Sequence, residues 1–112
     1  MSVSYFIRYA GVPADREAFL AHYRDKHALI LRRYPGIRAC RLHHPTPWVD
    51  PVPVNKDQVF LLAELVFDDE EALNRALASA TRLESRADFQ SFPSLSGGDI
   101  RHLAVVTEVL FF

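Results

Sequence analysis

Residues 15–34, DREAFLAHYRDKHALILRRY, place a histidine and a tyrosine in the middle of the apolar stripe of one predicted helix. At about 100° per residue, the apolar side chains of this stretch fall within an arc of about 120°. Tyr23 and His27 lie near the centre of that arc, and Asp15 is the expected N-cap. The face that this helix must bury therefore carries an imidazole and, one turn earlier, a phenol.

The rest of the chain alternates between strand and helix patterns. Runs of β-branched and aromatic residues predict strands over 3–9, 37–44, 58–67 and 100–112. Four acidic residues, Asp68 to Glu71, begin a second helix that runs to about Ala80. Residues 81–98 are expected to be irregular, with a short turn of helix at 85–92. The order strand–helix–strand occurs twice, which predicts one α+β domain over residues 1–112, with the ferredoxin-like βαββαβ topology and a four-stranded antiparallel sheet.

A proline-rich arm interrupts this pattern between the two units. Residues 45–57, PTPWVDPVPVNKD, contain prolines that exclude a helix and a central strand. We expect an extended segment, with Trp48 as an apolar anchor. Such an arm either packs on another surface or covers a pocket as a lid, and the sequence leaves both open.

Strand alternation predicts that the sheet has two apolar faces, of which the helices can cover one. The first is expected to carry Tyr5, Ile7 and Tyr9; Leu61, Ala63, Leu65 and Phe67; and Leu103, Val105, Thr107 and Val109. The second is expected to carry Phe6 and Arg8; Phe60, Leu62, Glu64 and Val66; and Ala104, Val106, Glu108 and Leu110. A monomer would expose the second face, so we expect a homodimer with sheet facing sheet and with Arg8 and Glu64 paired inside it.

Composition excludes several classes of protein. Thirteen basic and fourteen acidic residues are interspersed and give a net charge of −1, so no basic stripe indicates nucleic-acid binding. The apolar runs are too short to span a membrane. The first residues form a strand pattern without the features of a signal peptide, and the single cysteine, Cys40, excludes an internal disulfide. We therefore expect a cytoplasmic protein.

Three stretches of the chain resemble the EthD-like family of the dimeric α+β barrel superfamily: DREAFLAHYRDKHALI, RRYPGIR and AELVFDDEEAL. The family's helix usually has a tyrosine and then His-x-Pro-Leu, whereas Ala28, Leu29 and Ile30 follow His27 here. The resemblance implies a homodimeric barrel with a pocket between sheet and helices, under His27. The family's namesake is linked to ether degradation, and relatives include isomerases, cyclases, monooxygenases and haem-degrading enzymes. Many of them use no cofactor.

The candidate catalytic residues are His27, as a general acid or base, and Tyr23, which can orient the imidazole or donate to a substrate oxygen. Each also fits an ordinary core position. Phenols around one histidine suit a planar, oxygenated and mostly apolar ligand. The candidate substrate-binding residues are Tyr5, Ile7, Tyr9, Arg38, Cys40, Leu42, Leu61 and Ala63.

Other chemistry has weaker support in the sequence. Cys40 has no adjacent base and fits a small buried residue better than a nucleophile. Glu64 is assigned to the dimer face rather than to the pocket. His22 and His27 would point about 140° apart on a regular helix, and no carboxylate completes a metal site. We therefore expect no metal and no cofactor.

The leading hypothesis is a small cofactor-independent enzyme of catabolic or secondary metabolism. It would bind an apolar oxygenated molecule, such as a lactone, phenol or polyketide, and use His27 for proton transfer in an isomerisation or cyclisation. The alternative is a non-catalytic ligand-binding or accessory dimer. A haem-binding relative with His27 as the axial ligand, or a monooxygenase, is a further alternative.

Overall fold

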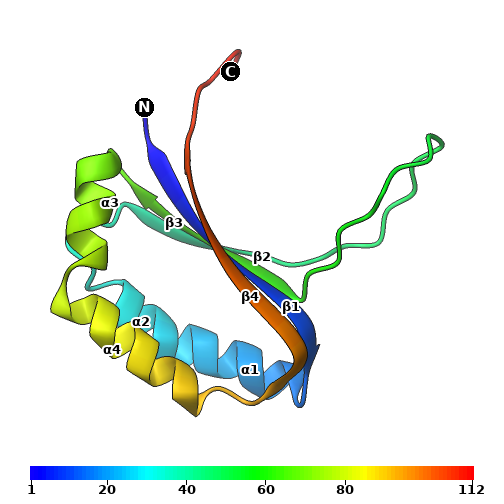
Figure 1. Cartoon of the computed structure of the whole chain (residues 1–112), viewed down its shortest axis with the longest axis horizontal. Coiled ribbons are helices and arrows are strands. Elements are labelled where there is room, and N and C mark those ends of the chain that lie inside the picture. The colour runs from blue at the N-terminus through cyan, green and yellow to red at the C-terminus, as the bar shows by residue number, and fades with distance from the viewer.

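A four-stranded antiparallel sheet carries all the helices on one of its faces in the computed structural model, which describes residues 1–112 (Figure 1). The strand order is β2-β3-β1-β4, which confirms the expected ferredoxin-like α+β fold. The two central strands, β1 and β3, pair in the register that puts Tyr5 opposite Leu65 and Tyr9 opposite Leu61. The strands are β1 (Val3–Pro13), β2 (Ala39–His43), β3 (Leu61–Phe67) and β4 (Leu95–Val106).

The helix layer consists of one interrupted helix and two short ones. The interrupted helix comprises α1 (Arg16–His22), a π-helical turn (Tyr23–His27) and α2 (Ala28–Leu31). The short helices are α3 (Glu70–Leu77) and α4 (Ala80–Asp88), followed by a 3₁₀ turn at Phe89–Ser91.

Aspartate caps begin two of these helices. Asp15 accepts a hydrogen bond from the backbone N–H of Ala18 (3.0 Å), as predicted, and Asp69 accepts one from Ala72 (2.8 Å). The stripe of the interrupted helix packs onto the sheet, where Phe19 and Tyr23 are almost fully buried.

Several expected boundaries were wrong: β1 runs to Pro13 rather than ending at residue 9, and β3 begins at Leu61 rather than at residue 58. The segment after α3 is not irregular, because α4 begins at Ala80 rather than at 85. Its sequence, ATRLESRAD, has too few apolar residues for a clear helical stripe. The last strand is also displaced: β4 begins at Leu95 and ends at Val106, and residues 107–112 lie beyond the sheet.

The predicted face of the last strand was wrong as well. The register of β1 with β4 places Ala104 opposite Tyr5 and His102 opposite Ile7, so these residues, not Leu103 and Val105, share the helix-covered face. A strand that is apolar on both sides gives no sign of which side faces inward. Phe60 was also assigned to the wrong face, because it precedes β3 and packs against Phe19 of α1 (ring centroids 4.9 Å apart).

Arg8 and Glu64 do not pair within the chain, contrary to expectation. In the register of β1 with β3, Glu64 lies opposite Phe6, while Arg8 lies opposite Leu62. The Arg8 guanidinium instead donates to Asp57 at the base of the arm (Nε to Oδ2, 3.1 Å). Glu64 accepts hydrogen bonds from partners on its own face of the sheet, namely Ser4 (2.7 Å) and His43 (2.9 Å).

Two segments project away from the sheet and the helices. Figure 1 shows the arm between β2 and β3 extending away from the helix layer, so it does not cover the residues around His27. Within the arm, Lys56 donates to the Trp48 carbonyl (2.9 Å) and lies over its ring. The C-terminal residues 107–112 form the second projecting segment.

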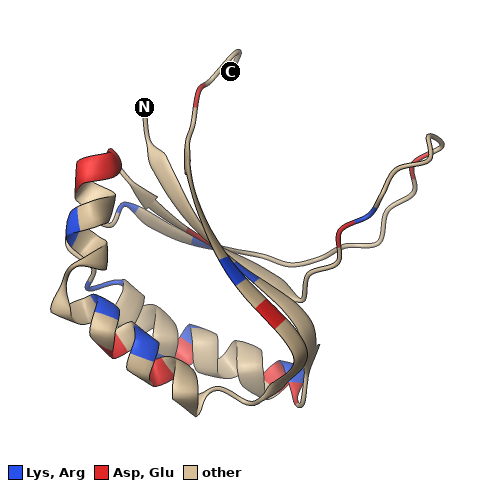
Figure 2. Cartoon of the chain, viewed as in Figure 1, with Lys and Arg blue, Asp and Glu red and all other residues tan.

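Charges of both signs are spread over the helices, the sheet and the arm (Figure 2). None of the helices has the length and apolar character needed to cross a membrane.

Candidate functional site

A π-helical turn brings His22 and His27 to the same side of their helix. The backbone N–H of Ala28 bonds to the carbonyl of Tyr23, five residues earlier. This i→i+5 pattern stacks residues five apart, where a regular α-helix would separate them, and such turns occur frequently at functional sites. The expected divergence of the two imidazoles was therefore wrong, because it assumed a regular helix.

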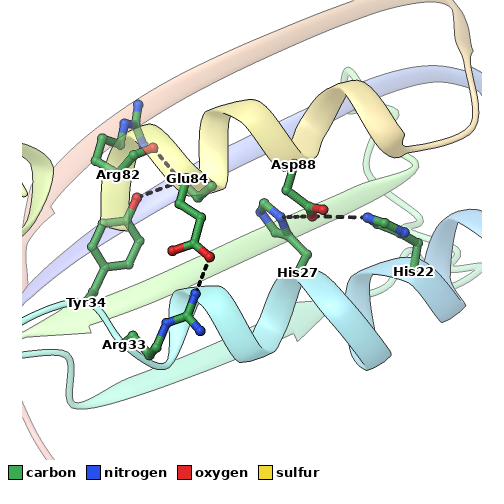
Figure 3. Close-up of polar contacts among 8 residues, drawn as sticks. His22, His27, Arg33, Tyr34, Arg82, Glu84 and Asp88 are labelled. Carbon is green, nitrogen blue, oxygen red and sulfur yellow. Dashed lines mark hydrogen bonds and ion pairs between the residues drawn. The ribbon is translucent and has the colours of Figure 1, made fainter. Parts of the chain in front are cut away.

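Asp88, the last residue of α4, receives both imidazoles on a single carboxylate oxygen. His27 Nδ1 lies 2.8 Å from Asp88 Oδ2, and His22 Nε2 lies 3.0 Å from the same atom. Figure 3 shows the two histidines reaching this carboxylate from the interrupted helix, across the interface with α4. The side chain of His27 is only 8% exposed. The cluster therefore joins two helices through a mostly buried ion pair or hydrogen-bonded network.

Asp88 lies where a helix least favours a carboxylate. The C-terminal end of a helix carries partial negative charge, so an aspartate at the last position of α4 is unfavourable on its own. Burial would raise its pKa further, but hydrogen bonds from His27 and His22 outweigh burial and hold the pKa of Asp88 below its usual value. The carboxylate is therefore ionised near neutral pH and can only accept hydrogen bonds.

The protonation state of His27 follows from that of Asp88. An ionised carboxylate requires a proton on Nδ1, so the neutral ring has its lone pair on Nε2. Burial lowers the pKa of His27, and Asp88 offsets only part of this effect. Nε2 makes no hydrogen bond within the chain. His27 is thus a neutral imidazole with a free basic nitrogen near pH 7.

The Tyr23 hydroxyl is the one fully buried side-chain polar atom without a hydrogen-bond partner. Its ring packs against His27 (centroids 5.0 Å apart) and Tyr9 (6.4 Å). Burial raises the pKa of Tyr23 well above its usual value, so the phenol keeps its proton. A buried donor without a partner costs stability and is available to a ligand oxygen.

A small cavity lies beside these groups, with a volume of about 30 Å³. A water molecule needs a cavity volume of roughly 10–15 Å³, so this cavity admits about two waters and no aromatic ring. The sheet, the interrupted helix and α4 all contribute to its wall. The lining residues are Ile7, Tyr9, Tyr23, His27, Leu31, Tyr34, Leu65, Arg82, Ser85, Arg86 and Phe89.

Of the predicted site residues, the structure brings four together at this cavity: His27, Tyr23, Ile7 and Tyr9. Tyr5 lies next to it on β1, where its hydroxyl accepts a hydrogen bond from Arg82 (3.3 Å). The other five predicted residues lie elsewhere.

Arg38 is exposed and paired with Asp68 (2.9 Å), away from the cavity. Cys40 borders a separate opening beside Ala28 and Arg32, and Leu42 packs at the edge of the core. Leu61 and Ala63 face the helices but are fully buried in the core. These five residues are not part of the cavity wall.

The sequence did not reveal the carboxylate that holds His27, and the expectation of phenols rather than a carboxylate beside it was wrong. Asp88 lies 61 residues from His27, in a segment for which the sequence predicted only a short turn of helix. No sequence motif marks Asp88, which follows the arginines of α4. His22, which shares Asp88 with His27, was the available signal in the sequence. The direction of its side chain can be predicted only if the π-helical turn is known.

The site does not suit a haem. The rings of Tyr23 and Phe92 each lie 5.0 Å from the His27 ring. A porphyrin plane on Nε2 would collide with these neighbours and with the wall of the small cavity. No group of three or more His, Cys, Asp or Glu side chains is arranged to hold a metal ion.

Comparison with solved structures agrees with the fold. An EthD family protein from Bacillus halodurans is 25% identical, with a TM-score of 0.72, over 96% of this chain and 100% of that chain. SnoaB, a cofactor-independent oxygenase from Streptomyces nogalater, is 21% identical with a TM-score of 0.60, over 96% of this chain and 94% of that one. The ActVA-Orf6 monooxygenase from Streptomyces coelicolor, solved with nanaomycin D, is 16% identical with a TM-score of 0.66, over 99% and 90% respectively.

Sequence comparison identifies the family. A relative from Rhodococcus erythropolis, an uncharacterized 11.0 kDa protein from the thcB–thcC intergenic region, is 28% identical over 82 residues, which cover 73% of this chain and 76% of that protein. The EthD domain model matches residues 13–94, which include the interrupted helix, α4 and Asp88. The chain therefore belongs to the EthD domain family.

Proposed function

We propose that this protein is a small enzyme of secondary metabolism that moves a proton on an apolar, oxygen-bearing substrate. The observation that carries the proposal is the buried His27, whose Nδ1 is held by Asp88 while Nε2 remains free beside a cavity. A carboxylate that fixes the tautomer and orientation of an imidazole is the usual arrangement for a histidine base.

The proposed step uses this chain's own groups. Nε2 of His27 takes a proton from an acidic C–H or O–H of the substrate, which becomes an enolate or phenolate. Asp88 then faces the imidazolium and stabilises its charge. The Tyr23 hydroxyl, which lacks a partner, donates a hydrogen bond to the developing oxyanion. Return of the proton to a different atom completes an isomerisation, and no other reactant is consumed.

Substrate entry requires the cavity to open, because about 30 Å³ holds only water. Two of the lining side chains, Arg82 and Arg86 of α4, are long, and both reach solvent. Rotation of these side chains enlarges the cavity without moving the helices or the sheet. We therefore place the substrate entrance on the side of α4 that carries the arginines.

Hydrogen–deuterium exchange tests the proposal without knowledge of the natural substrate. The protein is incubated in D₂O with enolisable aryl ketones such as α-tetralone, with lactones and with naphthols, and exchange at carbon is followed by NMR. His27→Gln is expected to lower the protein-catalysed rate by about 10²-fold or more. The matched control is His43→Gln, because His43 also binds a carboxylate, Glu64, but on the other face of the sheet.

The same experiment separates the alternative of a non-catalytic binding protein, which the small cavity favours. Wild-type protein that binds these compounds but exchanges none of them supports that alternative. SnoaB and ActVA-Orf6 are described as oxygenases, so oxygen uptake is measured on the same panel. Uptake that depends on His27 would place the chemistry in oxygenation rather than isomerisation.

We also propose that two copies pack through the face of the sheet that the helices leave open. Leu103 on this face is 60% exposed, and the C-terminal Leu110 and Phe111 are each 79% exposed. Large apolar side chains exposed on the sheet and on the segment that follows it favour coverage by a second copy. Leu103→Glu is expected to give a monomer in sedimentation, while the control Leu83→Glu, on the exposed side of α4, is not. A wild-type monomer would contradict the assembly.

A further inference from the structure

One face of α4 points two arginines at the cavity that contains His27. Arg82, Ser85, Arg86 and Phe89 follow the i, i+3, i+4, i+7 spacing of one helix face, and all four line the cavity. Arg82 is half-buried and appears beside Tyr34 at the end of the helix pair in Figure 3.

Neither of these arginines has an acidic partner. Arg8, Arg38 and Arg101 pair with Asp57, Asp68 and Asp99. The arginines at 16, 24, 32 and 75 also lack an acidic partner, but they are exposed to water, whereas Arg82 is half-buried. The Arg82 guanidinium instead donates to the Tyr5 hydroxyl (3.3 Å) and lies 5.6 Å from the centre of the Tyr5 ring. A half-buried guanidinium without a carboxylate is costly unless an anion reaches it.

The surroundings of the two arginines carry positive potential. His102 of β4 lies beside Tyr5, with ring centroids 5.7 Å apart. Partial desolvation and the charges of Arg82 and Arg86 lower the pKa of His102. No carboxylate on the packed elements forms an ion pair here, because Asp88 is occupied by His22 and His27.

The cavity wall therefore carries two kinds of polar group that a ligand can satisfy. The buried Tyr23 hydroxyl lacks a partner on the helix side, and the two guanidinium groups lack a counter-ion on the α4 side. A ligand that satisfies both needs an oxygen at one end and an anion at the other. Guanidinium groups bind carboxylates through paired, charge-assisted hydrogen bonds.

We propose that Arg82 and Arg86 bind the carboxylate of an aromatic hydroxy acid, so that the phenolic hydroxyl of the same molecule reaches Tyr23 and His27. The inference rests on the proposed function of His27 and narrows its substrate from an apolar, oxygen-bearing molecule to one whose aromatic ring also carries a carboxylate. Binding of the acid draws the arginine side chains to the carboxylate and enlarges the cavity, which has a volume of about 30 Å³ without a ligand.

Calorimetry with matched pairs of acid and ester tests this subsite. The probes are 3- and 4-hydroxybenzoate and 6-hydroxy-2-naphthoate, each compared with its methyl ester. Wild-type protein is expected to bind at least one acid ten-fold or more tightly than its ester. The double variant Arg82→Gln/Arg86→Gln is expected to lose this preference, so that each acid and its ester bind alike.

Arg75→Gln is the control, because Arg75 lies exposed on α3 outside the cavity and also lacks an acidic partner. It is expected to keep the wild-type preference. Equal affinities for every acid and its ester, absence of binding by every acid, or an equal loss in Arg75→Gln would each overturn the proposal.

NMR titration of His102 provides a readout that needs no turnover. An acid bound to Arg82 and Arg86 screens their charges, so the pKa of His102 is expected to rise on binding of the acid and not of the ester. An unchanged pKa with bound acid would place the ligand elsewhere and overturn the subsite.

Failure of the subsite and failure of the proposed function give different results. His27→Gln is expected to keep the preference for acid over ester, because that preference depends on Arg82 and Arg86 and not on the absolute affinity. Acid preference together with exchange that ignores His27 would retain the subsite and remove the enzymatic role. Exchange that depends on His27, without any preference for acid over ester, would retain the enzymatic role and remove the subsite.

Discussion

Two carboxylates of this protein hold imidazoles, and they lie on opposite faces of the sheet. On the helix side, Asp88 receives His27 and His22 on one oxygen. On the open face, Glu64 receives His43 at one oxygen (2.9 Å). The pair chemistry is the same, but the side chain of His27 is 8% exposed and that of His43 is 46% exposed.

The difference shows that enclosure, rather than the carboxylate–imidazole pair, makes a candidate site. Aromatic rings surround the Asp88 cluster: Phe92 lies 4.4 Å from the His22 ring and 5.0 Å from the His27 ring. This packing fixes the imidazole and lowers the pKa of His27 through burial. Glu64 also accepts a hydrogen bond from Ser4 and forms an ion pair with Arg41 at 3.6 Å, and its cluster leaves no enclosed basic nitrogen.

The largest expected effect comes from removing the enclosure. Phe92→Ala deletes a buried ring that touches both histidines and is expected to cost about 3 kcal/mol of unfolding free energy. Urea denaturation measures this loss. Leu83→Ala, an apolar truncation on the exposed side of α4, is the control and should change stability by less than about 0.5 kcal/mol. Equal losses in the two variants would show that Phe92 does not enclose the cluster.

The next effect compares the carboxylates directly. Asp88→Ala leaves two mostly buried imidazoles without an acceptor and is expected to cost about 2 kcal/mol. Glu64→Ala should cost about 1 kcal/mol or less, because His43 and Arg41 can turn to water. Both variants are measured by urea denaturation at one protein concentration. A larger loss for Glu64→Ala would reverse the contrast between the two faces.

The sequence predicted the elements that carry a strong local signal. Aspartate caps, prolines and two-residue alternation located the strands, the interrupted helix and α3, and their order predicted the ferredoxin-like fold. The apolar stripe also placed Tyr23 and His27 in the buried face, where the structure has them.

What the sequence could not predict depends on relations between distant segments. The register of β4 decides which of its faces points to the helices, and an apolar strand leaves that open. The polar α4 lacks a stripe of its own, so the helix that carries Asp88, Arg82 and Arg86 was expected to begin too late. The π-helical turn changes the direction of His22 without any residue that marks it.

A smaller effect is expected in the dependence of stability on pH. Burial lowers the pKa of His27 in the folded chain, so the unfolded chain binds a proton first as the pH falls. Stabilisation by neutral His27 is complete above about pH 6.5 and is lost as the pH falls toward the folded pKa. The lowered pKa of Asp88 adds a second loss below about pH 4.

The urea midpoint of the wild type is therefore expected to fall between pH 7 and pH 5, and that of His27→Gln to fall less. Lys26→Gln, an exposed change on the same helical turn, should keep the wild-type slope. If the urea midpoints of the wild type and of His27→Gln fall equally with pH, the imidazole of His27 has the same pKa in the folded and the unfolded chain.

The smallest effect concerns two phenols of the same helix layer. Tyr34 and Ser85 share a hydrogen bond (3.0 Å), so Tyr34→Phe should lose about 1 kcal/mol. The Tyr23 hydroxyl is buried without a partner, so Tyr23→Phe should leave stability unchanged or raise it by up to about 1 kcal/mol. If Tyr23→Phe instead destabilises the chain as much as Tyr34→Phe does, the hydroxyl has a partner such as a bound water. A gain in stability together with lost exchange activity would identify Tyr23 as a group kept for a ligand rather than for the fold.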